Sequence, residues 1–330
     1  MLDIVMQCAD AKIIGITGHT NPDGDCVSST LGMWQFLKKA MPQKEIYVFL
    51  EKPAPIFSFI AGADSIVFVD HADAIARDKK ELVCDVMIVL DTILERTGNA
   101  YHYVQRAKKV INIDHHVSNA GEGDVSLVDP KASATAELVY ELVTAKPAYR
   151  ELMDRELAQT LYIGIIHDCG VMQYSNTTPK TLRIVADLVE YGFDFPKLID
   201  ETFYERSQVQ SKITGKAMQE AFPLLGGAVM AARIDRNTMQ EMGAEKKDLS
   251  GIVNQLRIIK GVEVAVFAYE TEHDVYKFSL RSCGGVDVAK VCCRFGGGGH
   301  VRAAGCTLEG DFEASLSRIE NEIRSQLQQL

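Results

Sequence analysis

Short runs rich in Val, Ile and Leu alternate with helical patterns through the first part of the chain, and this alternation restricts the fold more than any other feature. Strands are predicted over residues 12–18, 46–50, 66–69, 86–90 and 109–113, and helices over 28–40, 133–143 and 156–166. Near-continuous apolar strands are typical of a parallel sheet that is buried on both faces. The pattern therefore predicts an α/β fold with helices on both sides of a parallel sheet.

A second domain follows a polar, helix-prone segment that begins near Phe195 and ends near Phe222. Beyond it, strands are predicted over 228–234, 262–269 and 275–281, and helices near 249–259, 286–295 and 312–327. A chain of 330 residues with 47% hydrophobic residues is long enough for two cores. We expect a parallel-sheet domain over 1–190, a helical linker over 191–221 and a smaller mixed α/β domain over 222–330.

The bulk composition limits the function and the location of the protein. Its net charge of −10 argues against binding along extended nucleic acid, which depends on many Lys and Arg residues, but leaves a small anionic substrate open. The sequence has no leader-like start and no apolar run near the ~20 residues of a membrane span, so a cytoplasmic location is expected. The eight cysteines show no zinc-binding spacing, and most of them are expected to be small buried hydrophobes.

Acidic and histidine residues gather where predicted strands and helices end. They are His19, Asp23 and Asp25 in one loop, then Asp91, then Asp114 with His115 and His116, and finally Asp168. In an open α/β sheet, functional residues lie beyond the carboxyl ends of the strands, which is where His19, Asp91 and Asp114 fall. Each cluster alone is explained by a polar turn or a helix cap, but their coincidence predicts a shared site.

These residue types indicate a pair of divalent metal ions. Several carboxylates with about one imidazole per ion suit Mn²⁺, with Mg²⁺ as the alternative, better than a structural zinc site. Two such ions ~3.5–4 Å apart can activate a water molecule near neutral pH and stabilise the transition state of phosphoester hydrolysis. The adjacent His167 could equally be a charge at the end of a helix, so its role stays undecided.

A second cluster lies near the C-terminus. It combines Arg281 with the run Gly296–Gly299, followed by His300 and Arg302. Glycine-rich runs are commonly flexible linkers. This run is short, lies between helix and strand patterns and is flanked by cationic side chains, which favours a backbone that approaches phosphate closely.

The motifs together resemble the DHH phosphoesterase superfamily. The closest resemblance is to its members with a C-terminal DHHA1 domain, the nano-RNase and pAp-phosphatase type. It covers nearly the whole chain through the 19–25 loop, Asp91, the 114–116 triplet with Asn119, residues 133–137, Asp168 with Gly170, Arg281 and the glycine run. It implies hydrolysis of very short oligonucleotides to mononucleotides, and of 3′-phosphoadenosine 5′-phosphate to AMP, in a cleft between the two domains.

The resemblance also implies roles for individual residues. One metal ion would be held by His19, Asp23 and Asp91, and the other by Asp25, Asp91, His115 and Asp168. Asp114 would orient the ligand histidines, and His116 would contact the scissile phosphate or the leaving group. Substrate phosphate would be bound by Arg281, Gly297, Gly298, Gly299, His300 and Arg302, with a mobile linker allowing closure. Proteins of this type often form homodimers, and the sequence identifies no interface.

Two departures from the usual family pattern bring thiols close to the expected metals. Cys26 follows Asp25 where many relatives have Ala, and Cys169 follows Asp168 where Thr or Ser is common. Neither change removes a ligand. They predict sensitivity to oxidation or to thiophilic metals.

Other members of the superfamily give the competing functions. Pyrophosphatases lack the glycine run, and RecJ-type exonucleases are longer and carry an additional oligonucleotide-binding fold. Hydrolysis of cyclic dinucleotides or of their linear products stays open, as does a binding or sensor role without turnover. The sequence does not decide among the substrates, the direction of attack, or RNA against DNA.

Overall fold

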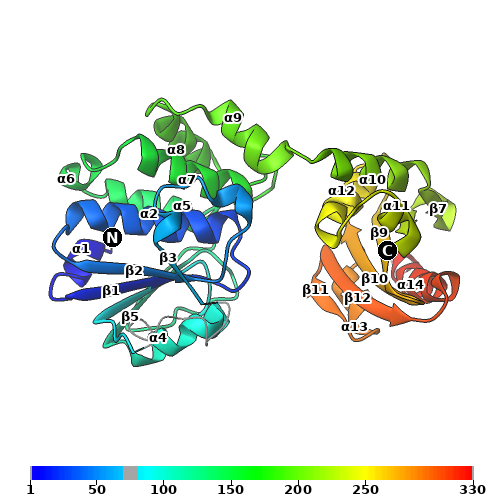
Figure 1. Ribbon diagram of the computed structural model, residues 1–330, viewed down its shortest axis with the longest axis horizontal. Coiled ribbons are helices and arrows are strands. Elements are labelled where there is room, and N and C mark those ends of the chain that lie inside the picture. The colour runs from blue at the N-terminus through cyan, green and yellow to red at the C-terminus, as the bar shows by residue number, and fades with distance from the viewer. Residues whose placement is uncertain (1, 70–80, 329–330) are drawn as a thin grey trace. The chain divides into compact units, whose positions relative to one another are not determined.

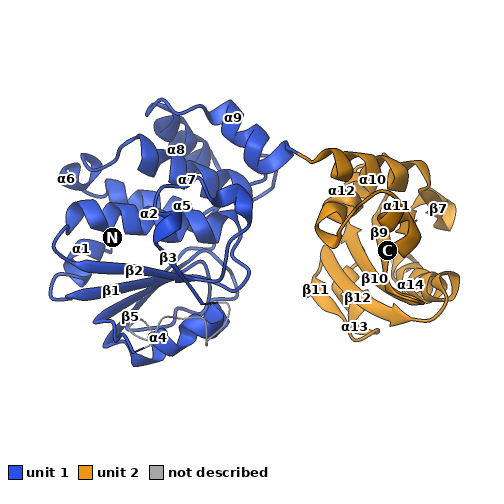
Figure 2. Ribbon diagram, viewed as in Figure 1, with its two compact units in different colours: residues 1–205 blue, residues 206–330 orange. Residues whose placement is uncertain are grey.

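The chain forms two compact units, residues 1–205 and 206–330 (Figure 2). In this computed structural model, the described residues are 2–69 and 81–328. Each unit has its own sheet and its own hydrophobic core.

A six-stranded parallel sheet forms the centre of the first unit (Figure 1). Its strands are β1 (Ile13–Thr17), β2 (Glu45–Leu50), β3 (Ile66–Phe68), β4 (Val86–Leu90), β5 (Lys109–Asp114) and β6 (Val125–Val128), in the order β3-β2-β1-β4-β5-β6. Neighbouring strands pair in parallel throughout, for example Ile14 with Val86 between β1 and β4. The predicted parallel sheet is confirmed, and β6 is an additional edge strand.

Helices cover both faces of this sheet (Figure 1). On one face lie α2 (Gly24–Ala40), α5 (Thr135–Thr144) and α7 (Arg155–Asp168), which also pack against one another. On the other face, η3 (Leu94–Ala100) and α4 (Tyr101–Arg106) pack against strand side chains such as Phe49 and Met87. The buried strands therefore contact apolar side chains on both sides, which explains their continuous apolar character.

Two of these helices extend beyond the limits expected from sequence. Helix α2 begins at Gly24 rather than near Ser28, because Asp23 accepts hydrogen bonds from the backbone N–H groups of Asp25 and Cys26 and caps the helix. Helix α7 continues through Asp168. Both differences place expected ligands inside a helix terminus rather than in a free loop.

The remaining elements of the first unit are short or peripheral. They are α1 (Ile4–Gln7), η1 (Pro55–Phe57), η2 (Ala63–Ser65), α6 (Pro147–Arg150), α8 (Pro179–Val189), α9 (Phe195–Ile199) and the π-helical turn η4 (Asp200–Tyr204). Helix α8 packs against α7 through its apolar face.

The second unit contains a mixed six-stranded sheet in the order β11-β12-β10-β9-β8-β7. Its strands are β7 (Phe222–Leu224), β8 (Val229–Ile234), β9 (Val264–Glu272), β10 (Val275–Ser282), β11 (Gly298–His300) and β12 (Ala303–Glu309). Strands β8 and β9 are parallel, and the other pairs are antiparallel. The predicted mixed α/β domain is confirmed.

Helices cover both faces of this second sheet as well. One face packs against α13 (Val288–Cys293) and α14 (Phe312–Leu327). The other packs against α10 (Gln208–Gln219), α11 (Arg236–Glu241) and α12 (Ile252–Arg257). Short helical turns lie at η5 (Leu225–Gly227) and η6 (Lys246–Leu249). Within the described ranges, no helix combines the length and the apolar character needed to cross a membrane.

Candidate metal centre

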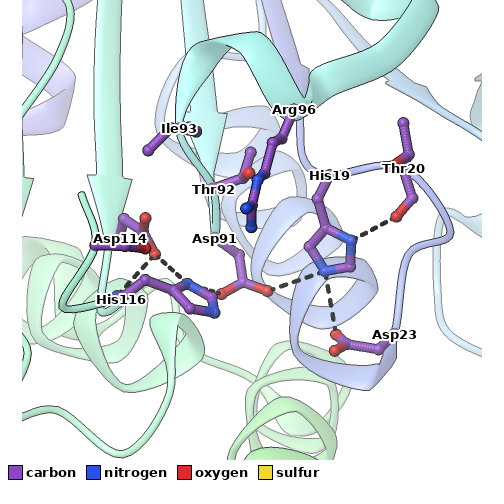
Figure 3. A pocket seen from close by; sticks show the side chains of 10 residues that line it. His19, Thr20, Asp23, Asp91, Thr92, Ile93, Arg96, Asp114 and His116 are labelled. Atoms are coloured by element: carbon purple, nitrogen blue, oxygen red, sulfur yellow. Dashed lines mark hydrogen bonds and ion pairs between the residues drawn. The ribbon is translucent and has the colours of Figure 1, made fainter. Parts of the chain in front are cut away.

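The candidate site lies at the carboxyl edge of the first sheet, where the strand order reverses between β1 and β4. His19 follows β1, Asp91 follows β4 and Asp114 ends β5. A cavity of about 450 Å³ opens there, lined by His19, Thr20, Asp23, Asp91, Thr92, Ile93, Arg96, Asp114, His116 and Ser118 (Figure 3). The position is the one at which open α/β sheets bind ligands.

His19 is held so that one ring nitrogen faces two carboxylates. Its Nδ1 atom lies 2.8 Å from the carbonyl oxygen of Thr20, which makes Nδ1 the protonated nitrogen and the donor. Its Nε2 atom lies 3.6 Å from Oδ1 of Asp23 and 3.5 Å from Oδ2 of Asp91 (Figure 3). A histidine fixed in this tautomer presents an Nε2 lone pair to a cation.

Asp25 lies in the first turn of α2, and its buried carboxylate faces the N-terminus of α5. Its carboxylate accepts hydrogen bonds from the backbone N–H groups of Thr135 at 2.6 Å and Ala136 at 2.9 Å. A helix N-terminus favours a negative charge. Nevertheless, burial raises the pKa of Asp25 well above its ordinary value, and the nearby carboxylates of Asp91 and Asp168 add to this effect. The two backbone N–H donors therefore do not fully offset the cost of burying the ionised Asp25 carboxylate.

Asp91 lies between the two halves of the cluster. Its backbone adopts a left-handed conformation with φ of 63°, which is unusual for a residue other than glycine and is typical of strained functional positions. Its Oδ2 faces His19, whereas its Oδ1 lies 3.6 Å from Nε2 of His115 and 3.7 Å from Nδ1 of His116. The two oxygens of one carboxylate can thus serve two neighbouring sites.

His115 and Asp168 form the other half of the cluster. Nε2 of His115 lies 3.2 Å from Oδ2 of Asp168 and 4.0 Å from Oδ2 of Asp25. Asp168 lies in the last turn of α7, where the helix dipole disfavours a negative charge. Burial raises the pKa of Asp168 to about 6. Burial and the helix dipole both disfavour the ionised form of this carboxylate, which a nearby cation would stabilise.

Asp114 is buried and organises the two histidines that follow it. Its Oδ1 accepts hydrogen bonds from the backbone N–H groups of His115 and His116 and, at 2.8 Å, from Nδ1 of His116. Its Oδ2 accepts a 2.7 Å hydrogen bond from the Asn119 amide. The hydrogen bond that Nδ1 of His116 donates to Asp114 raises the pKa of His116, whose side chain is half exposed at the cavity. Asp114 therefore holds the His116 ring at the cavity, and both of its own oxygens are occupied by hydrogen bonds.

The donor set fits a divalent cation. Three groups of donor atoms lie close enough to share an ion, namely His19 with Cys26 and Asp91, Asp91 with His115 and His116, and Asp25 with His115 and Asp168. Among the described residues, the ion-pair partners of the site aspartates are histidines rather than Lys or Arg. Buried carboxylates that lack a fixed positive partner are stabilised by a bound metal ion.

His167 does not join these groups. Its ring packs against Gly24, where an added Cβ would lie 2.4 Å from the imidazole, and meets the ring edges of Phe57 and Phe203. Burial lowers the pKa of His167 to about 4. The sequence left its role undecided, and the structure places it as a neutral packing residue behind the loop that carries Asp23 and Asp25.

The second unit aligns part of the other predicted cluster across three strands. Arg281 in β10 pairs with Ala303 in β12, and Ala303 pairs with His300 in β11. Residues directly opposite one another in a sheet share a face, so Arg281 and His300 lie on the same side of the sheet. Arg302 is exposed in the turn between β11 and β12, and its carbonyl oxygen accepts a hydrogen bond from Ser282.

The second half of the glycine run, Gly298 and Gly299, lies in the edge strand β11, and Gly296 and Gly297 before it donate backbone hydrogen bonds to Cys293 and Cys292. An added Cβ at Gly297 would lie 2.2 Å from the carbonyl oxygen of Gly305, and at Gly299 it would lie 2.4 Å from that of Ala303. Gly299 also has a φ of 144°. A side chain at either of these two positions would collide with β12, so both positions require glycine, whereas Gly298 faces open space.

Two contributors to the site are not predicted by the sequence. Arg96 reaches the cavity from η3, and Figure 3 shows its side chain extending into it. Thr135 lies in the 133–137 motif, to which the sequence assigns no role in the site, and it donates hydrogen bonds to Asp25 and Asp91. These contacts join segments far apart in sequence, so no local pattern identifies them.

The comparisons with known proteins agree with this geometry. Residues 13–165 match the DHH family, N-terminal domain, and residues 226–329 match the DHHA1 domain. Together with the fold, these matches define the class of the protein. It is a two-domain α/β protein with an acidic and histidine-rich site at the edge of the first sheet. The chain belongs to the DHH family and carries a DHHA1 domain, as the motifs predicted.

The similarity extends along almost the whole chain. It is 31% identical to the bifunctional oligoribonuclease and PAP phosphatase NrnA of Thermus thermophilus, over 98% of this chain and 92% of that protein. It is 29% identical to the protein of the same name from Bacillus subtilis, over 90% of this chain and 89% of that protein. A crystal structure of an exopolyphosphatase-related protein from Bacteroides fragilis shares the fold, with a TM-score of 0.87 and 24% identity over 98% of this chain and 94% of that chain.

Proposed function

We propose that the protein is a metal-dependent phosphoesterase that hydrolyses very short oligonucleotides to mononucleotides and 3′-phosphoadenosine 5′-phosphate to AMP. The observation that carries this proposal is the cluster of carboxylates and imidazoles at the reversal point of the sheet, in a chain that is similar over nearly its full length to relatives named for these two activities. The cavity of about 450 Å³ is of a size suited to a small ligand.

The proposed metal ligands follow the two halves of the cluster. One cation would be held by His19, Asp23 and Asp91, and the other by Asp25, Asp91, His115 and Asp168. Mn²⁺ is the proposed metal, with Mg²⁺ as the alternative, because the donors are mostly carboxylates. When bound, the two ions would supply an activated water molecule and offset the charge of the phosphoryl oxygens.

His116 is the proposed proton donor to the leaving group or to the scissile phosphate. Its Nδ1 is fixed by Asp114, which keeps the ring oriented toward the cavity and stabilises its charged form. Arg96, which lines the same cavity, would bind a phosphate oxygen of the substrate. Both side chains act on the negative charge that every candidate substrate carries.

Residues of the second unit would bind substrate phosphate as well. Arg281 and His300 share one face of the second sheet, and Arg302 lies in the adjoining turn. The backbone N–H groups of Gly298 and Gly299 are the proposed anion donors beside them, whereas the N–H of Gly297, expected from the sequence to bind phosphate too, donates to the carbonyl oxygen of Cys292. In this assignment residues 1–190 form the catalytic domain, 191–221 the linker and 222–330 the substrate-binding domain.

Turnover by purified protein tests the proposal. The wild type, an Asp91→Ala variant and an Asp10→Ala control are incubated with Mn²⁺ and either a 5′-phosphorylated RNA dinucleotide or 3′-phosphoadenosine 5′-phosphate. Asp10 is exposed in the turn before β1, so its loss leaves the site intact. We expect mononucleotide from both substrates with the wild type and the control, and none with Asp91→Ala. Wild-type rates in Asp91→Ala would overturn the metal assignment, and no product from either substrate would overturn the activity.

A further inference from the structure

Cys26 occupies a position that none of the assigned roles explains. It lies in the first turn of α2, directly after Asp25, and its side chain is fully buried. Its Sγ atom is held beneath the 19–25 loop, because an added Cβ at Gly18 would lie only 2.2 Å from it. The sulfur lies 4.0 Å from the carbonyl oxygen of His19, which is at the limit of a weak hydrogen bond.

The thiol faces the same space as the first group of donors. The Cys26 sulfur, a ring nitrogen of His19 and a carboxylate oxygen of Asp91 all lie within 4.8 Å of one another. Nε2 of His19 is also 3.6 Å from Oδ1 of Asp23. One nitrogen, one oxygen and one sulfur therefore lie close enough to share an ion, and Asp23 adjoins them through its contact with His19.

Cys169 provides a contrast within the same site. It follows Asp168 as Cys26 follows Asp25, and it is also buried. Its Sγ accepts a 3.3 Å hydrogen bond from the backbone N–H of Met172, at a turn that includes Val171 and Met172 in the left-handed region. Among the described residues it belongs to none of the donor groups. Cys169 thus stabilises a turn, whereas Cys26 faces the donors.

We propose that the Cys26 thiolate is a fourth protein ligand of the cation held by His19, Asp23 and Asp91, and that it raises the affinity of this half of the site for thiophilic divalent metals of the Zn²⁺ class while adding nothing to its affinity for Mn²⁺. The inference rests on the proposed function, because it concerns one of the two proposed cations. On binding, the S–H proton passes to solvent and the sulfur lone pair forms the metal bond. A donor set of four with one thiolate and one imidazole suits Zn²⁺ or Co²⁺, whereas Mn²⁺ gains little from sulfur.

Cobalt absorption spectroscopy of the purified chain tests this ligand directly. Co²⁺ is added without oxygen to the metal-free wild type, to Cys26→Ser and to the matched control Cys169→Ser. We expect a near-ultraviolet thiolate-to-cobalt charge-transfer band in the wild type and in Cys169→Ser, and its loss in Cys26→Ser, with the visible bands of bound Co²⁺ present in all three. Visible bands without the charge-transfer band in the wild type would overturn the thiolate ligand and leave the proposed metal site intact.

A competition experiment that compares Zn²⁺ and Mn²⁺ affinities is a second test, and its result does not depend on the overall stability of a variant. We expect Cys26→Ser to weaken Zn²⁺ binding at least as much as the ~10–100-fold that loss of an outer hydrogen-bond partner costs, while Mn²⁺ affinity stays within about threefold. An equal loss for both metals would contradict the inference, because it would indicate damage to the loop rather than loss of a sulfur donor. Failure of the wild type to bind any divalent cation would overturn the proposed function together with it.

Discussion

The hydroxyl of Thr135 donates a 2.9 Å hydrogen bond to Oδ1 of Asp91, and thereby connects the first turn of α5 to the end of β4. The backbone N–H of the same residue donates to Asp25. One threonine thus fixes two carboxylates that come from different segments of the chain. Hydrogen bonds of this kind orient metal ligands before the metal arrives.

Removing only the hydroxyl isolates this contribution. Thr135→Val keeps the backbone N–H and a similar shape, and we expect it to weaken Mn²⁺ binding by ~10–100-fold, because Asp91 loses its orienting partner. Isothermal titration calorimetry measures the change. Thr144→Val is the matched control, since the Thr144 hydroxyl on the same helix donates to the carbonyl oxygen of Tyr140 and not to a proposed ligand. Equal affinity in the two variants would show that Thr135 does not orient the ligand.

Gly164 allows three helices to meet directly behind Asp25. An added Cβ there would lie 2.6 Å from Cβ of Ala136 on α5, 2.9 Å from Cβ of Ser28 on α2 and 3.0 Å from Oδ1 of Asp25. Contacts this short require the backbones to move apart. The position of Asp25 therefore depends on the absence of a side chain in α7.

Substitution at this glycine is expected to affect stability and activity together. Gly164→Ala should lower the free energy of unfolding by about 1–3 kcal/mol through overpacking, and should reduce turnover because Asp25 is displaced. Gly215→Ala in α10 is the control, since nothing lies within 4 Å of its added Cβ, and it should raise stability by about 0.5–1 kcal/mol. Urea unfolding separates the two cases. A stabilised Gly164→Ala would contradict the packing argument.

The sequence predicted those parts of the site that depend on where strands end. The strand over 86–90 was predicted with the observed limits, and Asp91 follows it as expected. Because parallel strands end at one edge, His19, Asp91 and Asp114 had to come together once the sheet was recognised. The period of apolar residues also predicted α14 over 312–327.

Features that depend on long-range packing could not be predicted in this way. The sequence does not reveal that Thr135 meets Asp91 or that Arg96 reaches the cavity, because these contacts join separate elements. Strand β6 is short and only partly buried, so its residues show little periodicity. Two glycines of the run at 296–299 are required by their approach to β12, which is a neighbour that no local pattern identifies.

Arg96 provides a cation at the cavity, and its loss should weaken the binding of an anionic substrate. Arg96→Met is expected to lower kcat/KM by about 10- to 100-fold, mainly through KM, as one charge-assisted hydrogen bond contributes about 1.5–3 kcal/mol. Steady-state kinetics with 3′-phosphoadenosine 5′-phosphate measure this. Arg183→Met, on the exposed surface of α8, should leave both constants unchanged. An unchanged KM for Arg96→Met would remove this residue from substrate binding.

Asp85 stabilises the start of the central strand, far from the candidate site. Its Oδ2 accepts hydrogen bonds from the backbone N–H groups of Lys12 at 2.8 Å and Ile13 at 3.0 Å. Its Oδ1 accepts a 2.7 Å hydrogen bond from Lys108. The Lys108 ammonium, followed by the two backbone donors, lowers the pKa of Asp85 to about 2. The ionised carboxylate is therefore the form that the folded chain prefers.

This preference makes part of the stability depend on pH. Because the pKa is lower in the folded chain than the ordinary value of 3.8, the contribution is complete above about pH 5 and is lost as the pH falls from about 4 to 2. We expect Asp85→Asn to reduce the free energy of unfolding by about 1 kcal/mol at pH 7, a modest value because Lys108 is largely exposed. Asp10→Asn, in the exposed turn before β1, should show no such loss. Urea unfolding at several pH values follows the difference between wild type and Asp85→Asn, which should shrink toward zero near pH 2. A difference that stays constant between pH 7 and pH 2 would mean that the lost shape of the carboxylate, and not its charge, accounts for the effect.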